Sequence, residues 1–170
     1  MICRISGLLE GVNGIGATIA SPAGDVAREV LLPAYLAARW EHGGRREVTL
    51  HTLEYLEAQG QGTSFIPRLV GFESARDRAF FQLLTTVKGI GNRKALRAMA
   101  AEPGAIARAI VGKDTKALTK LPEVGKRMAE TIIAELSGRV EGYLAPGEVA
   151  ELAAGATPPA GGRRAAAEEA

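Results

Sequence analysis

Side chains suited to metal or thiol chemistry are scarce in this sequence. The chain has one cysteine, Cys3, and two histidines, His42 and His51. A single cysteine excludes an intrachain disulfide and a cysteine-based metal cluster, and two histidines without cysteine partners do not make a zinc site. Because Cys3 falls in an alternating, strand-like segment, we expect its thiol to be buried and inert. We therefore predict no bound metal and no cofactor.

The sequence also lacks a hydrophobic run of about 18 residues, the length that a membrane-spanning helix requires. The first residues, 1–14, contain one arginine but neither the long apolar stretch nor the small-residue cleavage site of a secretory leader. These absences predict a cytoplasmic protein that does not contact a membrane.

Signatures of catalysis are missing as well. A Walker A loop requires Ser or Thr after its Gly-Lys pair and a glycine five positions before it. Gly125-Lys126 is followed by Arg127, and Lys120 occupies the upstream position. Carboxylates are not clustered as a metal-dependent nuclease requires, and no serine is accompanied by a histidine. We predict that the chain has no intrinsic catalytic activity.

Positive charge is concentrated in one block of the chain. The formal net charge is only +2, but residues 88–127 hold ten Lys and Arg against three acidic residues. Such a block favours a polyanionic partner, because each neutralised phosphate releases counterions. A solvated helix face with scattered lysines would give the same composition, so charge alone does not separate the two interpretations.

Hydrophobic periodicity divides the chain into a β region and an α region, and the fold class is therefore α+β. Five short strands separated by Gly-rich turns and one small helix at 34–40 predict an OB-fold barrel over residues 1–72. The strands are expected at 2–9, 17–20, 29–32, 47–53 and 65–72.

Helical spacing follows from Ser74, a predicted N-cap with Asp77 three residues later. Short helices are expected at 105–111, 115–121 and 127–140, and residues 73–144 form the second predicted domain. Residues 145–170 are rich in alanine and interrupted by Pro-Pro and Gly-Gly. We expect them to form a flexible tail, with a helical turn near 148–154.

An internal repeat with an offset of 34 residues runs through the α region. Residues 84–95 align with residues 118–129. Each copy has an apolar residue, two variable positions, a second apolar residue, glycine, a polar residue, arginine and, one position further, alanine. This pattern is that of the helix-hairpin-helix motif. A ligand-free helical hairpin with a glycine cap is the simpler alternative, and the repetition of the motif favours DNA binding.

The motif has a physical basis for binding phosphate. Glycine permits a tight hairpin, a buried Ile90 or Val124 would anchor it, and backbone amides would point outward where a helix begins. Basic side chains add charge-assisted contacts, and none of these groups reads base edges, so binding should not depend on sequence. The predicted phosphate-binding residues are Lys88, Gly89, Ile90, Gly91, Asn92, Arg93, Lys94, Val124, Gly125, Lys126 and Arg127.

Further motifs extend the comparison to residues 1–144. They are the M-I-x-R-x-x-G start, V-x-x-P at 30–33, L-V-G-F at 69–72, V-K-G-I-G-N-R-K-A at 87–95 and L-P-E-V-G-K-R-M-A at 121–129. With them the chain resembles the RuvA family, which binds four-way Holliday junctions in DNA recombination and repair. The resemblance implies a homotetramer or octamer that presents the junction to a RuvB-type ATPase motor, with a resolvase as a further partner.

Three departures from the family pattern carry expectations of their own. Glu123 stands where the family has glycine, and it should weaken the second site. The family's acidic pin between the fourth and fifth strands has only Glu54 and Glu57 as candidates here, which are equally well read as ordinary surface acids. The tail at 145–170 is short beside the family's three-helix C-terminal domain, so altered motor recruitment is expected.

Two other functions fit the same features. The chain could be a general helix-hairpin-helix scaffold that recruits a repair nuclease without loading a motor. It could also be a self-assembling structural protein whose basic block is incidental. A preference for junctions over duplex DNA would distinguish the first reading from both.

Overall fold

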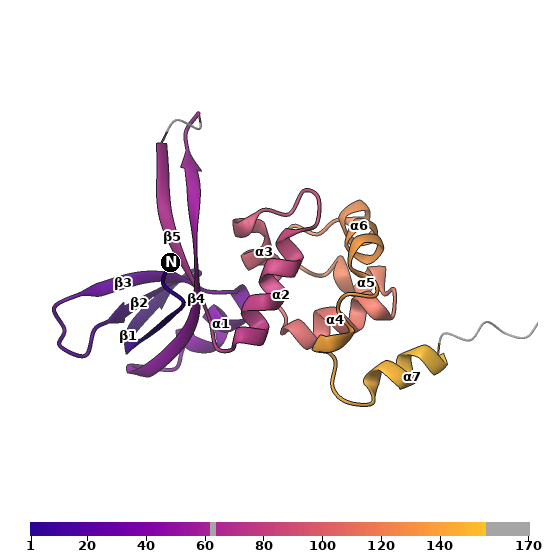
Figure 1. Ribbon diagram of the computed structural model, residues 1–170, viewed down its shortest axis with the longest axis horizontal. Helices are drawn as coiled ribbons and strands as arrows, with labels where there is room; N and C mark the ends of the chain where they lie inside the picture. Colours follow the sequence, from indigo (N-terminus) through magenta and orange to yellow (C-terminus); the bar gives the residue numbers. More distant parts are fainter. Residues whose placement is uncertain (62–63, 156–170) are drawn as a thin grey trace, which may run out of the picture.

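A five-stranded β-barrel precedes a cluster of short helices in the computed structural model, which describes residues 1–61 and 64–155 (Figure 1). This architecture confirms the predicted α+β class with an OB-type barrel. The strands are β1 (Arg4–Asn13), β2 (Gly16–Ala20), β3 (Ala27–Leu31), β4 (Arg46–Gln59) and β5 (Ser64–Phe72). The helices are α1 (Ala34–Glu41), α2 (Ala75–Thr85), α3 (Asn92–Ala98), α4 (Pro103–Val111), α5 (Thr115–Leu118), α6 (Lys126–Leu136) and α7 (Glu148–Gly155), with a 3-10 turn, η1 (Glu141–Tyr143), before α7.

The barrel closes in the order β1-β2-β3-β5-β4, with β3 and β5 paired in parallel at Leu31 and Val70. Two glycines of the recognised motifs permit this closure. A Cβ on Gly7 would lie 2.2 Å from the carbonyl oxygen of Ala20, and one on Gly71 would lie 2.7 Å from side-chain atoms inside the barrel. Both positions therefore require glycine because another part of the sheet approaches closely.

The core is continuous from the barrel into the helices. Leu9, Leu36 and Trp40 fill the barrel, while Phe72 at the end of β5 packs on Phe81 of α2 with ring centroids 5.2 Å apart. This packing seats the helical cluster against one end of the barrel.

Local signals predicted several element ends correctly. The Ser74 hydroxyl accepts a hydrogen bond from the Asp77 amide at 3.0 Å, which confirms the N-cap of α2. The predicted helical turn after residue 147 is present as α7, and the rest of the predicted tail, 156–170, lies outside the described residues. The last long helix ends at Leu136 and not at residue 140, because Gly138 adopts φ +82° and breaks the helix.

The expectation of a buried Cys3 is wrong. Strand β1 begins at Arg4, and the Cys3 side chain, which lies before the strand, is exposed. The backbone of Cys3 still contributes to the sheet, since its carbonyl accepts a hydrogen bond from the Thr52 amide at 2.9 Å.

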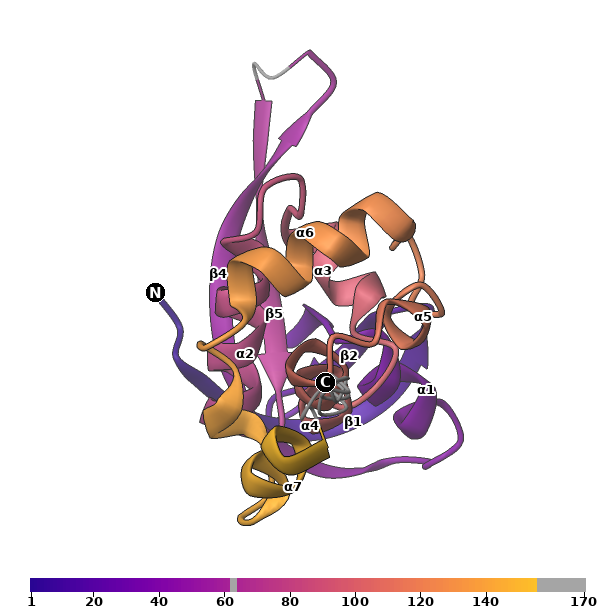
Figure 2. The ribbon, with the colours of Figure 1, turned by 90° about the vertical axis from the view of Figure 1, so that its right-hand side faces the viewer.

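Strand β4 is longer than predicted and forms a ribbon that leaves the barrel. It pairs with β1 over Arg46–Leu9 to His51–Arg4, whereas from Thr52 to Gln59 it pairs with β5 alone. The two strands therefore project beyond the barrel wall as an isolated pair (Figures 1 and 2). We call this pair, residues 54–61 and 64–69, the β4–β5 ribbon.

Candidate nucleic-acid interface

The sequence repeat is also a repeat of backbone hydrogen bonds. In the first hairpin, between α2 and α3, the Ile90 amide donates to Val87 O at 3.0 Å, and the Ala95 amide donates to Gly91 O at 2.9 Å. Both bonds recur 34 residues later, from Val124 to Leu121 and from Ala129 to Gly125, at 3.2 and 2.9 Å. The second hairpin, between α5 and α6, is therefore a structural copy of the first.

The apolar residue of each hairpin has the predicted inward position. Ile90 and Val124 are buried to the same extent, and their amides are used within the hairpin. The outward-facing donors are instead those that begin α3 and α6, where Gly91 and Gly125 are N-caps without a side-chain capping bond. The first amides of a helix have no acceptor within it, so an anion can occupy them.

Only the first position of each G-x-G pattern requires a left-handed backbone. Gly89 has φ +86° and its counterpart Glu123 has φ +61°, whereas Gly91 and Gly125 have φ −86° and −81°. The second hairpin thus forms although its left-handed position holds a residue with a side chain, at a cost of about 1–2 kcal/mol.

Two contacts that the motif does not reveal join the hairpins to each other. Arg97 of α3 donates a hydrogen bond to the Glu123 carboxylate at 2.8 Å, and Glu135 of α6 accepts one from the Lys88 amide at 3.2 Å. Each contact crosses from one motif to the other, so the relative position of the two hairpins is held by both. Sequence reasoning missed Arg97 and Glu135, because both follow their hairpins by several residues.

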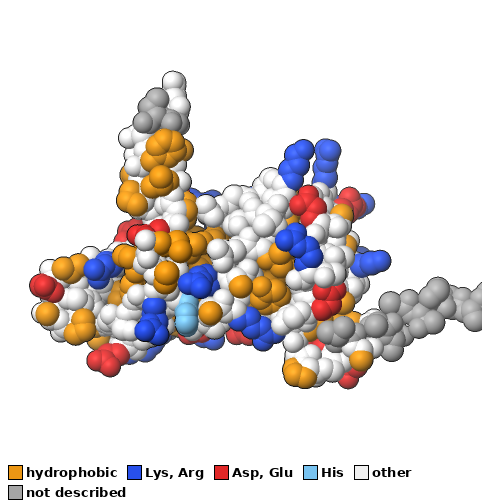
Figure 3. Space-filling view, viewed as in Figure 1, with side chains coloured by type: hydrophobic (Ala, Val, Ile, Leu, Met, Phe, Trp, Pro, Cys, Tyr) orange, Lys and Arg blue, Asp and Glu red, His pale blue; other side chains and the backbone are white. Residues whose placement is uncertain are grey.

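The hairpins border a shared groove of about 600 Å³. Glu123 is the acidic residue that lines it, and four basic side chains surround it. Within the described residues, none of these four forms a salt bridge, so their charge is available to a ligand. Figure 3 shows basic side chains extending from this part of the helical cluster. The lining residues are Lys88, Lys94, Glu123, Gly125, Lys126, Arg127, Met128 and Thr131.

Arg93 does not line the groove, although it belongs to the predicted set. Its guanidinium faces the β4–β5 ribbon and donates through Nε and Nη2 to the Glu57 carboxylate. Arg68 donates to the same carboxylate at 2.8 Å. The hydrogen bonds from Arg93 and then Arg68 lower the pKa of Glu57 to about 2. Asn92 is half-buried at the start of α3 and also lies outside the groove.

Neither candidate for an acidic pin lies at the tip of the ribbon. Both Glu54 and Glu57 are within β4. The Glu54 carboxylate accepts a hydrogen bond from the Ile2 amide at 2.9 Å, and the charge of Glu57 is balanced by two arginines. These contacts argue against either residue as a free negative charge.

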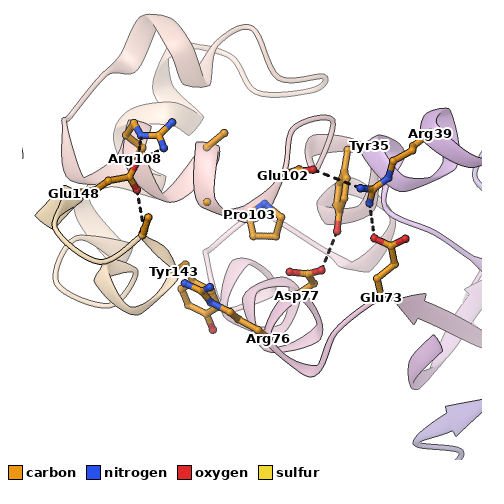
Figure 4. Close-up of a pocket in the computed structure, with 13 residues that line it drawn as sticks. Tyr35, Arg39, Glu73, Arg76, Asp77, Glu102, Pro103, Arg108, Tyr143 and Glu148 are labelled. Carbon is orange, nitrogen blue, oxygen red and sulfur yellow. Dashed lines mark hydrogen bonds and ion pairs between the residues drawn. The ribbon is translucent and has the colours of Figure 1, made fainter. Parts of the chain in front are cut away.

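A second concave region, of about 490 Å³, lies where α1, α2, α4 and the segment before α7 meet (Figure 4). Its arginines are already engaged. Arg39 pairs with Glu73 at 2.5 Å, Arg108 pairs with Glu148, and Arg76 donates to the Gly142 carbonyl at 2.7 Å. The Tyr35 hydroxyl donates to Asp77, and burial raises the pKa of Tyr35. This region is a balanced polar network that connects the elements around it, without unpaired charge for an anion.

Other ligand classes find little support in the part of the chain that is described. Residues 1–61 and 64–155 contain no group of three or more His, Cys, Asp or Glu that could hold a metal ion. In the same residues, no helix is both long and apolar enough to cross a membrane.

A barrel followed by two hairpins that share a cationic groove defines a DNA-binding protein of the tandem helix-hairpin-helix class. A family model described as a SAM-like helix-hairpin-helix tandem matches residues 81–137.

Comparison with curated proteins gives the particular family. The chain is 37% identical over 154 residues to the Holliday junction branch migration complex subunit RuvA of Rhodopirellula baltica, which covers 89% of this chain and 73% of that protein. It is 34% identical over 165 residues to the RuvA subunit of Deinococcus radiodurans, covering 96% and 73%. For the RuvA subunit of Desulfatibacillum aliphaticivorans the values are 38% over 136 residues, covering 79% and 65%. The chain belongs to the RuvA family.

Proposed function

We propose that this chain binds four-way DNA junctions through their phosphate backbone, independently of base sequence, as a subunit of a branch migration complex. The observation that carries the proposal is the groove between the two hairpins, in which Lys88, Lys94, Lys126 and Arg127 have no acidic partner within the described residues. The relatives are named as Holliday junction branch migration complex subunits, which supports the same ligand.

Phosphate binding at the groove combines two kinds of donor. Lysine and arginine side chains supply charge, and the amides that begin α6 at Gly125 supply hydrogen bonds near a helix N-terminus. The first hairpin contributes Lys88 and Lys94 with glycine at its left-handed position, while the second places the Glu123 carboxylate in the same groove. The first hairpin therefore makes the stronger contact, and the second the weaker one.

The assembly that would surround a junction is a homotetramer, since a four-way junction presents four similar arms to a protein with matching symmetry. The subunit itself performs no chemistry in this proposal. It holds the DNA for a RuvB-type motor, which hydrolyses ATP. Light scattering at several protein concentrations tests the tetramer, and stimulation of the motor's ATPase by this chain tests recruitment.

The deciding experiment is a competition between a four-way junction and duplex DNA of equal length at two salt concentrations. We expect the junction to displace the duplex at both salt concentrations, and the affinity for either DNA to fall as salt rises. Equal affinity for the two DNAs would contradict the proposal and favour a general helix-hairpin-helix scaffold.

A further inference from the structure

The β4–β5 ribbon exposes two large apolar side chains that no contact in the fold explains. Leu56 is 68% exposed and Phe65 is 58% exposed. The ribbon is an isolated strand pair at this point, because β1 ends its pairing with β4 at His51. Exposed apolar side chains that cluster on a projecting element mark a surface for interaction.

Strand pairing places these side chains on one face of the ribbon. Leu56 is opposite Pro67, and Ala58 is opposite Phe65. Because directly opposed residues share a face and neighbours along a strand alternate, these four residues form one apolar face. Glu57 lies on the other face, toward α3, where Arg93 binds it.

The charge of the ribbon suits DNA. Residues 58–67 contain no charged side chain, so this end of the ribbon does not repel phosphate. The nearest carboxylate, Glu57, is neutralised by Arg93 and Arg68. An uncharged apolar projection beside a cationic groove has the composition of an element that inserts between bases.

The ribbon also has a fixed place relative to the groove. It rises on the same side of the molecule as the basic side chains of the helical cluster (Figures 1 and 3). The bonds from Arg93 to Glu57 tie it to α3, the helix that follows the first hairpin. DNA whose phosphates occupy the groove therefore has the apolar face within its neighbourhood.

We infer that Phe65 and Leu56 form an apolar wedge that stacks against unpaired or unstacked bases at the branch point of a junction. This inference rests on the proposed function and deepens it, because it names the part of the junction that the ribbon contacts. Continuous duplex offers no such bases without the cost of unstacking, whereas a branch point does. The wedge thus adds preference for junctions to the backbone affinity of the groove.

The test compares Phe65→Ala with Val26→Ala, which removes apolar surface from another exposed side chain far from the ribbon. The ligands are a four-way junction with 2-aminopurine beside the branch point and a duplex of equal length. We expect Phe65→Ala to weaken junction binding about tenfold, in the range for loss of one stacked base. Duplex affinity and Val26→Ala should match the parent, and Phe65→Tyr should restore binding.

The fluorescence of 2-aminopurine should rise when the parent binds and unstacks the branch point, and it should change little with Phe65→Ala. Parent-like junction affinity and fluorescence for Phe65→Ala would overturn the wedge while leaving the proposed function intact. A smaller oligomer of Phe65→Ala in light scattering would also overturn it, because the apolar face would then be a contact between copies of the chain. If the parent itself does not prefer the junction, the proposed function fails first.

Discussion

Glu57 of β4 and Arg93 of α3 form an ion pair between the β4–β5 ribbon and the first helix-hairpin-helix motif. They are 36 residues apart in sequence, and the Glu57 side chain is only 18% exposed. The pair takes Arg93 away from the groove and gives the ribbon a fixed orientation. The structure therefore changes the meaning of both residues, from a phosphate ligand and a pin candidate to two ends of one tether.

Replacing Glu57 by glutamine should expose the pH dependence of this tether. Because the pKa of Glu57 is about 2 in the fold and its ordinary value is 4.5, the carboxylate contributes stability that is complete above pH 4.5 and is lost as pH falls toward 2. We expect Glu57→Gln to lower the free energy of unfolding by about 1 kcal/mol at pH 7, since solvent still screens the pair. Urea unfolding should show the difference shrinking below pH 4.5, and a difference that is constant down to pH 3 would contradict the assignment.

Gly89 and Gly91 should respond differently to alanine. Gly89 has φ +86°, and a Cβ there would lie 3.1 Å from Met128 Cε, whereas Gly91 has φ −86° and open space around it. Gly89→Ala should cost about 1–2 kcal/mol of stability and weaken DNA binding. Gly91→Ala is the matched control and should stay within about 0.5 kcal/mol of the parent. Equal losses in urea unfolding would show that the left-handed backbone is not the reason for glycine.

Removing the carboxylate of Glu123 should strengthen DNA binding severalfold, because it is the acidic group in the groove. Glu123→Gln removes the charge and keeps the backbone strain, and Glu123→Gly removes both. For Glu123→Gly, relief of strain is offset by a more flexible unfolded chain and by loss of the Arg97 pair, so stability should change by less than about 1 kcal/mol. Junction titrations in which Glu123→Gln binds like the parent would show that this carboxylate does not oppose phosphate.

The lysines of the groove should determine how strongly binding depends on salt. Each phosphate contact contributes about 0.9 to the slope of log affinity against log salt concentration. Lys94→Ala and Lys126→Ala should each reduce the slope by about that amount. Lys116→Ala, in α5 and outside the groove, is the control and should leave the slope unchanged. A reduction of equal size with Lys116→Ala would place the DNA elsewhere on the basic block.

Local patterns predicted the hairpins because the motif is written in consecutive residues. The repeat at 34 residues, the buried Ile90 and Val124 and the Ser74 cap depend on neighbours in sequence, and each is present. The ribbon was harder to foresee. Residues 54–59 include Glu54, Glu57 and Gln59, which do not favour strands on their own, and it is the pairing with β5 that makes them one.

Long-range contacts account for most of what the sequence did not reveal at the candidate site. The bonds from Arg93 to Glu57, from Arg97 to Glu123 and from the Lys88 amide to Glu135 join residues 26 to 47 positions apart. No periodicity links such residues, because their approach depends on how helices and ribbon pack. The sequence therefore predicted which residues carry charge, and the fold decided which of those charges are free.

Strand β4 passes from the barrel wall into the ribbon without a break, pairing with β1 at one end and with β5 at the other. Its 14 residues span about 45 Å at the rise of an extended strand. Barrel and ribbon are thus one lever, with its fulcrum where β1 ends its pairing. A load on the tip becomes a torque on the barrel, and the pair between Glu57 and Arg93 acts as a strut against that rotation.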